Sequence, residues 1–436
     1  MRRLILSTLL AAGLVQAGQA QQLDPRERRL LAAVDAGTGQ AISLLEQLVE
    51  LNSGTLNFEG VRAVGELLGT GFRELGFMTR WVSGDAWGRA GHLIAEWHGD
   101  GRGPRILLIG HLDTVFEKDS PFQAFQRIAG DSARGPGITD MKGGDVVMLL
   151  ALRALKDAGL LDQLQITAVF TGDEEDSGDP IALARRDLIA AADWADVAIG
   201  FENGPPEPHV AVVARRGSTS WVLRASGQAS HSSQVFKPSV GSGAIYELAR
   251  VLTAFHDSLS AEPYLTFNPG VVLGGTSVSF DSVQNRGTAF GKTNVVAEGA
   301  VAAGDLRALT PEQLANAKAT MERLVARHYP RTGATIRFED SYPPFAPTDG
   351  NRRLLAMLDQ ASRDAGLPPV AAVDPSRAGA ADISFVAGRV EMALDGLGLK
   401  GPGDHTVNET ADLKMLAVQA KRAALLLARL GARPAP

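Results

Sequence analysis

Five side chains of the kinds that bind metal ions follow short apolar segments of this 436-residue sequence. They are His111, Asp140, Glu175, Glu202 and His405. Imidazole and carboxylate ligands without any cysteine favour zinc, with Co2+ or Mn2+ as substitutes. If the three carboxylates bind as anions and the imidazoles bind neutral, two divalent cations keep one net positive charge, which suits a bound hydroxide. The set therefore predicts a site for two Zn2+ ions that activates water.

The chain before His111 indicates how one of these ligands is positioned. Residues 105–110 (RILLIG) form a short apolar run with β-branched residues, which predicts a buried strand that ends at His111. Residues two apart on an extended chain face the same way, so we expect His111 and Asp113 to touch. A metal-bound imidazole often donates its other N–H to a carboxylate, and this is the role predicted for Asp113.

The other carboxylates also lie where predicted elements begin or end. Asp140 lies in a glycine-flanked loop before a buried helix, and an apolar run at 197–201 delivers Glu202. A strand at 164–170 breaks into four successive carboxylates at 173–176, which repel one another unless cations neutralise them or water solvates them. One carboxylate must stay unligated to accept the proton of the water. Spacing alone does not tell Glu174 from Glu175 for that role.

This ordered set of motifs resembles the di-zinc metallopeptidases that include glutamate carboxypeptidase, aminoacylase and succinyl-diaminopimelate desuccinylase. The likeness covers nearly the whole chain after the first 20 residues. It implies that Asp140 bridges the two zinc ions. His111 and Glu202 would complete one site, and Glu175 and His405 would complete the other.

The same resemblance assigns roles that spacing leaves open. It implies that Glu174 is the general base and that Asp113 orients His111. Glutamate at the position of Glu202 is similar to the carboxypeptidase and deacylase branches, whereas aminopeptidase branches tend to carry aspartate there. Taken singly, each of these residues also fits a strand end, a helix cap, a solvated turn or a surface loop. The prediction therefore depends on their occurrence together and in order.

Three more candidates come from the middle of the chain by resemblance. The segment 227–232 (GQASHS) is similar to a lid motif whose histidine, here His231, reaches the active site of the partner subunit and contacts the substrate carbonyl or the developing oxyanion. Asn294 and Arg307 match lid positions used around the substrate carboxylate, with a strand-edge amide and a surface salt bridge as the alternatives. Relatives end a glycine-rich segment with Thr-Asp or Ser-Asp, where this chain has Ala381-Asp382. The missing hydroxyl bears on which C-terminal residue is preferred.

Length and element order predict two domains and an α/β fold. A chain of 436 residues exceeds what one core usually organises. Strands and helices alternate up to Glu202, as in a doubly wound sheet whose ligands collect beyond the carboxyl ends of the strands. We expect a mixed-sheet catalytic domain that is interrupted by an inserted α+β, ferredoxin-like lid and dimerisation domain. The expected boundaries are a signal peptide at 1–20, catalytic segments at 21–208 and 341–436, and the inserted domain at 209–340.

The N-terminal residues predict export. Arg2 and Arg3, an apolar run from Leu4 to Val15 and small residues up to Ala20 resemble a secretory signal peptide with cleavage near Ala20. The run is too short to span a bilayer, so we expect a periplasmic or secreted protein with no membrane contact in its mature form. The absence of cysteine excludes a lipoprotein anchor and disulfides. Removal of the two arginines changes the formal net charge from −6 to −8, which argues against nucleic-acid binding.

Together these features predict a zinc-dependent exopeptidase or amidohydrolase, similar to glutamate carboxypeptidase, that cleaves an amide next to a free C-terminal carboxylate. The expected substrate is a small peptide or an N-acyl amino acid, and the resemblance implies a homodimer formed through the inserted domain. An N-acyl-amino-acid deacylase (aminoacylase) would use the same metal centre. A periplasmic solute-binding protein would share the export signal and the two domains. Such a receptor has no need for an unligated glutamate beside five metal ligands.

Overall fold

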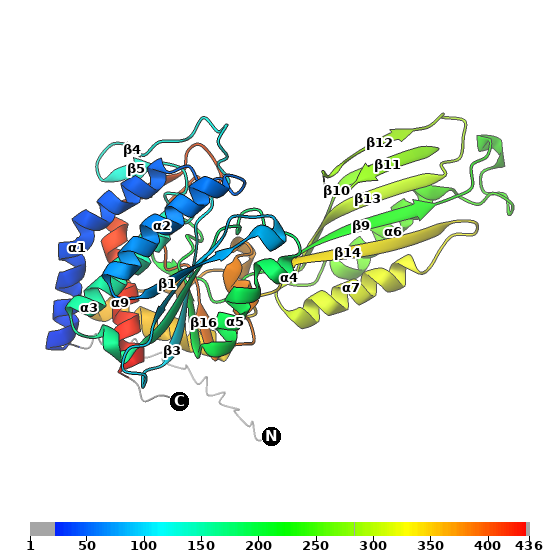
Figure 1. Cartoon of the computed structure of the whole chain (residues 1–436). Coiled ribbons are helices and arrows are strands. Elements are labelled where there is room, and N and C mark those ends of the chain that lie inside the picture. Colours follow the sequence, from blue (N-terminus) through cyan, green and yellow to red (C-terminus); the bar gives the residue numbers. More distant parts are fainter. Residues whose placement is uncertain (1–21, 283, 433–436) are drawn as a thin grey trace, which may run out of the picture.

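A computed structural model describes residues 22–282 and 284–432 and shows a larger and a smaller body joined by two chain crossings (Figure 1). The predicted signal peptide lies outside these residues. None of the helices in the described part of the chain is long and apolar enough to cross a membrane. The larger body holds the predicted metal ligands.

The larger body is built around a six-stranded sheet. Its strands, in spatial order, are β1 (Met78–Ser83), β2 (Gly91–Trp97), β6 (Gln165–Thr171), β3 (Arg105–His111), β7 (Val197–Gly200) and β16 (Met392–Leu394). β3 pairs in parallel with both β6 and β7, and β7 pairs in parallel with β16. β1 and β2 add antiparallel pairs at one edge. The expected mixed sheet is therefore confirmed, and the carboxyl ends of β3, β6 and β7 lie side by side.

Helices cover both faces of this sheet because its strands are apolar on both sides. Along β3, Ile106 and Leu108 pack into the core formed with one set of helices, whereas Leu107 and Ile109 pack into the core on the opposite face. The first set comprises α1 (Pro25–Glu50), α2 (Phe58–Glu74), α3 (Lys142–Asp157), α8 (Asp349–Asp364) and α9 (Lys414–Gly431). The opposite face is covered by α5 (Arg186–Trp194) and a 3₁₀ helix at Asp382–Val386, with the short α4 (Ile181–Ala184) preceding α5.

Two small sheets tie together the parts of the larger body that lie far apart in sequence. One has the order β17 (Thr410–Asp412), β5 (Ser132–Arg134) and β4 (Gln126–Arg127). The other pairs β8 (Val210–Ala211) in parallel with β15 (Ala371–Ala372). The pairing of β8 corrects the expected start of the inserted domain at residue 209. The apolar run from 210 to 214 resembles a first strand of that domain, but it is buried against the larger body.

The smaller body contains a four-stranded antiparallel sheet with helices on one face. In spatial order the strands are β10 (Thr266–Gly275), β13 (Gly299–Arg307), β9 (Ser218–Ser226) and β14 (Gly333–Tyr342), and the helices are α6 (Ala244–Leu259) and α7 (Pro311–Val325). Trp221, Leu223 and Phe255 lie in the core between sheet and helices. A hairpin of β11 (Ser277–Asp281) and β12 (Arg286–Phe290) packs Phe280 on the other face. The chain order is βαββαβ with this hairpin inserted, which is the arrangement expected of a ferredoxin-like body.

Candidate metal centre

Two groups of possible metal ligands share one aspartate. The first is His111, Asp140 and Glu202, and the second is Asp140, Glu175 and His405. Within each group the ligand atoms lie within 4.8 Å of one another. The structure thus brings together all five side chains that the sequence predicts as metal ligands, although they come from five separate segments of the chain.

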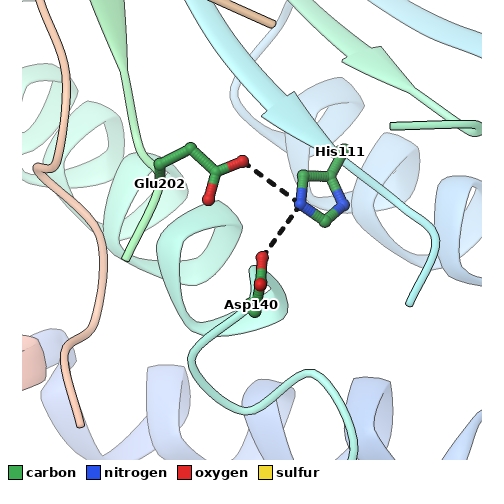
Figure 2. A group of neighbouring side chains, drawn as sticks. All are labelled: His111, Asp140 and Glu202. Atoms are coloured by element: carbon green, nitrogen blue, oxygen red, sulfur yellow. Dashed lines mark hydrogen bonds and ion pairs between the residues drawn. The ribbon is translucent and has the colours of Figure 1, made fainter. Parts of the chain in front are cut away.

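The first group is centred on the imidazole of His111, at the carboxyl end of β3 (Figure 2). Its Nε2 lies 3.2 Å from Oδ1 of Asp140 and 3.2 Å from Oε1 of Glu202. Its Nδ1 lies 3.1 Å from the carbonyl oxygen of Asp113 and 3.5 Å from the Asp113 carboxylate. One ring nitrogen therefore faces the possible metal position, and the other faces Asp113 as the sequence predicts.

The second group is centred on the imidazole of His405. Its Nε2 lies 3.1 Å from Oδ2 of Asp140 and 3.2 Å from Oε2 of Glu175. The two oxygens of Asp140 thus face two different imidazoles, which suits a carboxylate that bridges two ions. Oε1 of Glu175 is buried and has no hydrogen-bond partner among the described residues. A buried polar atom without a partner is costly, and a metal ion bound to this oxygen would supply the partner.

The charges of the site attract positive charge. Hydrogen bonds to Asp140 and Glu175 raise the pKa of His405 to about 11. Burial works against protonation of His111, yet the charge of Glu202 and hydrogen bonds to carboxylates raise its pKa well above the ordinary value. Burial raises the pKa of Glu175 to about 7. Divalent cations can replace the protons that these side chains hold in the metal-free protein. The residues therefore fit a pair of metal ions.

Glu174 lies in the same cavity and is not committed to another group. Its carboxylate makes no hydrogen bond or ion pair within the described part of the chain, although its backbone does. Burial, together with the negative charge of Glu202, raises its pKa well above the ordinary value for glutamate. A buried carboxylate whose charged form is disfavoured in this way is a candidate for proton transfer.

Asp113 does more than face His111. Its Oδ1 accepts a hydrogen bond from the N–H of Glu174 at 3.0 Å, and its Oδ2 accepts one from the N–H of Glu175 at 3.1 Å. The hydroxyl of Thr55 donates to the same Oδ2 at 2.6 Å. One buried carboxylate therefore positions a possible ligand on β3 and the turn that carries the possible base after β6.

Glu409 holds the loop of Asp140 and is a residue that the sequence did not single out. Its Oε1 accepts hydrogen bonds from the N–H groups of Thr139 and Asp140 at 2.8 and 3.1 Å. Its Oε2 accepts one from the N–H of Gly137 at 3.0 Å. Its place four residues after His405 was the available signal, because both residues belong to the loop that closes the site.

The candidate site opens into a cavity of about 360 Å³ that also holds a guanidinium. Arg215 is only 4% exposed. It donates through Nε to Asp395 at 2.8 Å and through Nη1 to the carbonyl oxygen of Gly379 at 2.8 Å. Its Nη2 also lies near Asp395 but makes no hydrogen bond with a described residue. Arg215 was not predicted, because the Arg215-Arg216 pair looks like an ordinary basic surface in the sequence.

The candidates in the smaller body are not part of this cavity. His231 and Asn294 are neighbours, since the N–H of Ser232 donates to the carbonyl oxygen of Asn294 at 2.9 Å. Both are exposed and lie beyond the far end of β9, which extends roughly 30 Å from the junction (Figure 1). Arg307 lies at the near end of the sheet, where its Nε is 3.1 Å from Oδ2 of Asp305. The structure thus brings His231 and Asn294 together but leaves both away from the metal ligands of their own chain.

Comparisons with known proteins agree with this geometry. Residues 107–429 match the model of peptidase family M20/M25/M40. The chain is 27% identical over 431 residues to carboxypeptidase G2 from Pseudomonas sp. (strain RS-16), which covers 98% of this chain and 97% of that protein. A probable succinyl-diaminopimelate desuccinylase from Staphylococcus epidermidis is 33% identical over 159 residues, or 35% of this chain and 36% of that protein.

Solved structures show the same fold. The metallo-carboxypeptidase Sso-CP2 from Sulfolobus solfataricus superposes with a TM-score of 0.64 and 16% identity, over 90% of this chain and 99% of that chain. The Bacillus subtilis YXEP protein, a dinuclear metal binding peptidase, gives a TM-score of 0.60 and 15% identity, over 91% and 98% of the two chains. The match of most of the sequence to one family model, on a chain whose potential ligands form two metal-binding groups, shows that this protein belongs to peptidase family M20/M25/M40 and is a hydrolase of the metallopeptidase kind.

Proposed function

We propose that this protein is a zinc-dependent exopeptidase or amidohydrolase that cleaves an amide next to a free C-terminal carboxylate. The observation that carries this proposal is the position of Asp140 between two ligand groups, with the uncommitted carboxylate of Glu174 in the same cavity. When bound, two zinc ions supply Lewis acidity toward a carbonyl oxygen and a water molecule. Glu174 accepts the proton of the attacking water and returns it to the leaving amine.

Arg215 supports a substrate with a free carboxylate. Its guanidinium lines the cavity that holds Glu174 and the possible ligands, and its Nη2, which lies 2.8 Å from Oδ2 of Asp395, meets no hydrogen-bond geometry with a described residue. A guanidinium binds a carboxylate through charge-assisted hydrogen bonds with defined geometry. The name of the 27% identical relative, a carboxypeptidase, is consistent with a terminal carboxylate near this position.

Zinc analysis and a substrate panel test this function. Zinc content near two ions per chain is expected, together with hydrolysis of N-acyl and folyl-type glutamates. The matched C-terminal amides of the same compounds are the control, and they should react slowly because they lack the charge that Arg215 binds. Preference for simple N-acyl amino acids over peptides would indicate that the enzyme is an N-acyl-amino-acid deacylase. A metal-free chain that binds these compounds without cleaving them would support a solute receptor and overturn the proposal.

We also propose that the protein acts as a homodimer in which the smaller body completes the site of the partner. His231 and Asn294 are exposed, adjacent to each other, and too far along β9 to reach the ligands of their own chain. β10 is an edge strand of the four-stranded sheet, with Val272 exposed on it, and Ile245 and Tyr246 are exposed at the start of the neighbouring α6. An edge strand beside apolar side chains is suited to pairing across a two-fold axis.

A mixing experiment tests the dimer. His231→Ala and Glu174→Gln chains should each be inactive alone. After denaturation and refolding at equal amounts, about half of the dimers are mixed and each mixed dimer has one complete site, so about 25% of wild-type activity should return. Equal mixing of the Glu174→Gln chain with a Glu175→Gln chain is the control, because none of the three possible dimers then has a complete site. Absence of recovery with His231→Ala, or a fully active monomer by light scattering, would contradict the arrangement.

We further propose that residues 1–20 direct export and are removed near Ala20. The mass of the protein recovered from a periplasmic or culture fraction is the test. Intact protein confined to the cytoplasm would contradict this part of the proposal.

A further inference from the structure

A fully buried arginine lies behind the turn that carries Glu174, outside the two ligand groups. Arg185 is 0% exposed. Its Nε donates to Oδ1 of Asp382 at 2.7 Å, and its Nη1 donates to Oδ1 of Asp173 at 2.7 Å. Its Nη2 donates to the carbonyl oxygen of Asp173, the hydroxyl of Ser177 and the hydroxyl of Tyr342 at 2.9 to 3.0 Å. Because each nitrogen is hydrogen-bonded and two carboxylates balance the charge, the cost of burying this ion is offset.

This arginine and its partners hold the carbonyl groups on both sides of Glu174. Arg185 binds the carbonyl oxygen of Asp173, which precedes Glu174. The hydroxyl of Tyr342, itself bound by Arg185, donates to the carbonyl oxygen of Glu174 at 2.9 Å. From the opposite side, Asp113 accepts the N–H of Glu174. The segment 173–180 has no helix or strand, and carboxylate side chains accept the N–H groups of Glu174, Glu175 and Gly178.

Asp382 anchors the same arginine to the central sheet. Its Oδ2 accepts a hydrogen bond from the hydroxyl of Thr171, the last residue of β6, at 2.5 Å. Asp382 is 3% exposed and does not line the cavity, although the neighbouring residues 377–381 do. The Asp382 carboxylate therefore points to Arg185 and away from the position that a substrate would occupy.

We propose that Arg185 is a positioning residue for Glu174, and that it acts through Asp173 and Tyr342. This inference rests on the proposed role of Glu174 as the base. Arg185 touches none of the possible metal ligands, but it sets the peptide groups on either side of Glu174 and so determines where that carboxylate points. The task needs an arginine because a planar guanidinium presents five donors in a fixed fork, whereas a lysine presents three donors at one point.

Tyr342→Phe is the sharpest test, because it removes one hydroxyl and keeps the ring that packs beside Phe385. We expect kcat to fall about tenfold or more with KM nearly unchanged, since a small misplacement of a catalytic group slows the chemical step. Zinc content should stay at the wild-type value. Tyr264→Phe, at an exposed tyrosine of the smaller body, is the matched control and should leave kcat unchanged.

A double variant separates positioning from general damage. If Tyr342 and Arg185 act through Glu174, Tyr342→Phe should not slow the residual rate of Glu174→Gln any further. Arg185→Ala should lose about 100-fold in kcat, and low concentrations of guanidinium should restore part of it, with no such rescue in Arg185→Lys. Full activity of Tyr342→Phe, or an equal loss in the Glu174→Gln background, would overturn the inference. An active Glu174→Gln would instead overturn the proposed function.

Discussion

Nε2 of His405 lies 3.1 Å from Oδ2 of Asp140, although the two residues are 265 positions apart in the sequence. Asp140 precedes the smaller body in the chain, and His405 follows it. The second ligand group therefore forms only when the two parts of the larger body dock. This docking is supported by the pairing of β7 with β16 and by the hydrogen bonds from the Asp140 loop to Glu409.

Replacement of His405 should remove one of the two metal ions. In His405→Ala we expect zinc content to fall from about two to about one per chain and kcat to fall at least 100-fold, because the second ion loses its imidazole. Elemental analysis of the dialysed protein measures the first change. His256→Ala, at a side chain that is 75% exposed, is the control. Two retained zinc ions in His405→Ala would contradict the assignment.

Replacement of Glu174 should stop catalysis without loss of metal. Glu174→Gln keeps the shape of the side chain but cannot accept a proton, so we expect kcat to fall by about 100-fold to 10,000-fold. Zinc content should match that of the wild type. Asp176→Asn is the matched control in the same acidic segment, since its carboxylate is exposed and paired with Arg89. A Glu174→Gln protein with zinc and near wild-type activity would remove this residue from the base role.

Binding of zinc to the metal-free protein should release protons. The pKa values of both imidazoles lie above the ordinary value, and that of His405 is about 11, so at pH 8 the free protein holds a proton on the ring of His405. Metal binding requires neutral imidazoles, and at least the proton of His405 should therefore leave. Apparent zinc affinity should rise with pH and weaken steeply toward acid, where Glu175 with a pKa of about 7 also takes up a proton.

Calorimetry in two buffers of different ionisation enthalpy counts these protons. His405→Ala lacks the ring that carries this proton. Zinc binding to the variant should therefore release about one proton fewer than zinc binding to the wild type. Zinc binding without proton release would show that the imidazoles are not ligands.

Loss of Glu409 should lower the stability of the fold as well as metal binding. In Glu409→Ala three buried N–H groups of the Asp140 loop lose their acceptor, at a cost of about 1–3 kcal/mol each that is not fully additive. We expect the free energy of unfolding of the metal-free protein to fall by about 3 kcal/mol in urea titrations. Glu391→Ala, at an exposed carboxylate paired with Arg353, should change it by less than about 0.5 kcal/mol. An unchanged stability in Glu409→Ala would show that water replaces the carboxylate.

Replacement of Arg215 should act on substrate binding. Arg215→Lys keeps the charge beside Asp395 but loses the planar fork, so KM for substrates with a free carboxylate should rise about tenfold. Their C-terminal amides should be affected little. Arg216→Lys is the matched control, because the side chain of Arg216 donates hydrogen bonds to Thr266 and Ser376 and does not line the cavity. Equal effects on acids and amides would remove Arg215 from recognition of the carboxylate.

The candidate metal ligands were predictable because three of them follow a signal that is local in the sequence, and the resemblance to a family added Asp140 and His405. His111 and Glu202 come directly after apolar strands, and Glu175 follows the break at Thr171-Gly172. The alternation of strands and helices predicted the mixed sheet, since each element must bury its own apolar face.

The supporting residues were not predictable, because their roles depend on contacts between distant segments. Glu409 and Arg185 look like ordinary charged residues until the fold places them beside the Asp140 loop and the Glu174 turn. Asp382 ends a segment that was compared with relatives only for its missing hydroxyl, and its partner Arg185 lies 197 positions away. The hairpin β11–β12 was missed as well, because its strands are exposed on most sides and lack a strong apolar pattern.

The parallel pairing of β7 with β16 also bears on how the chain is made. About 190 residues separate these neighbouring strands, and a ribosome needs roughly 10 to 40 s to add that length. The smaller body, from β9 to β14, is made within this interval and can fold before β16 is made, while the apolar sides of α1 and α3 remain exposed until α9 is made. A nascent chain therefore exposes an apolar surface until its last helix emerges. Removal of this C-terminal helix should cause the protein to aggregate.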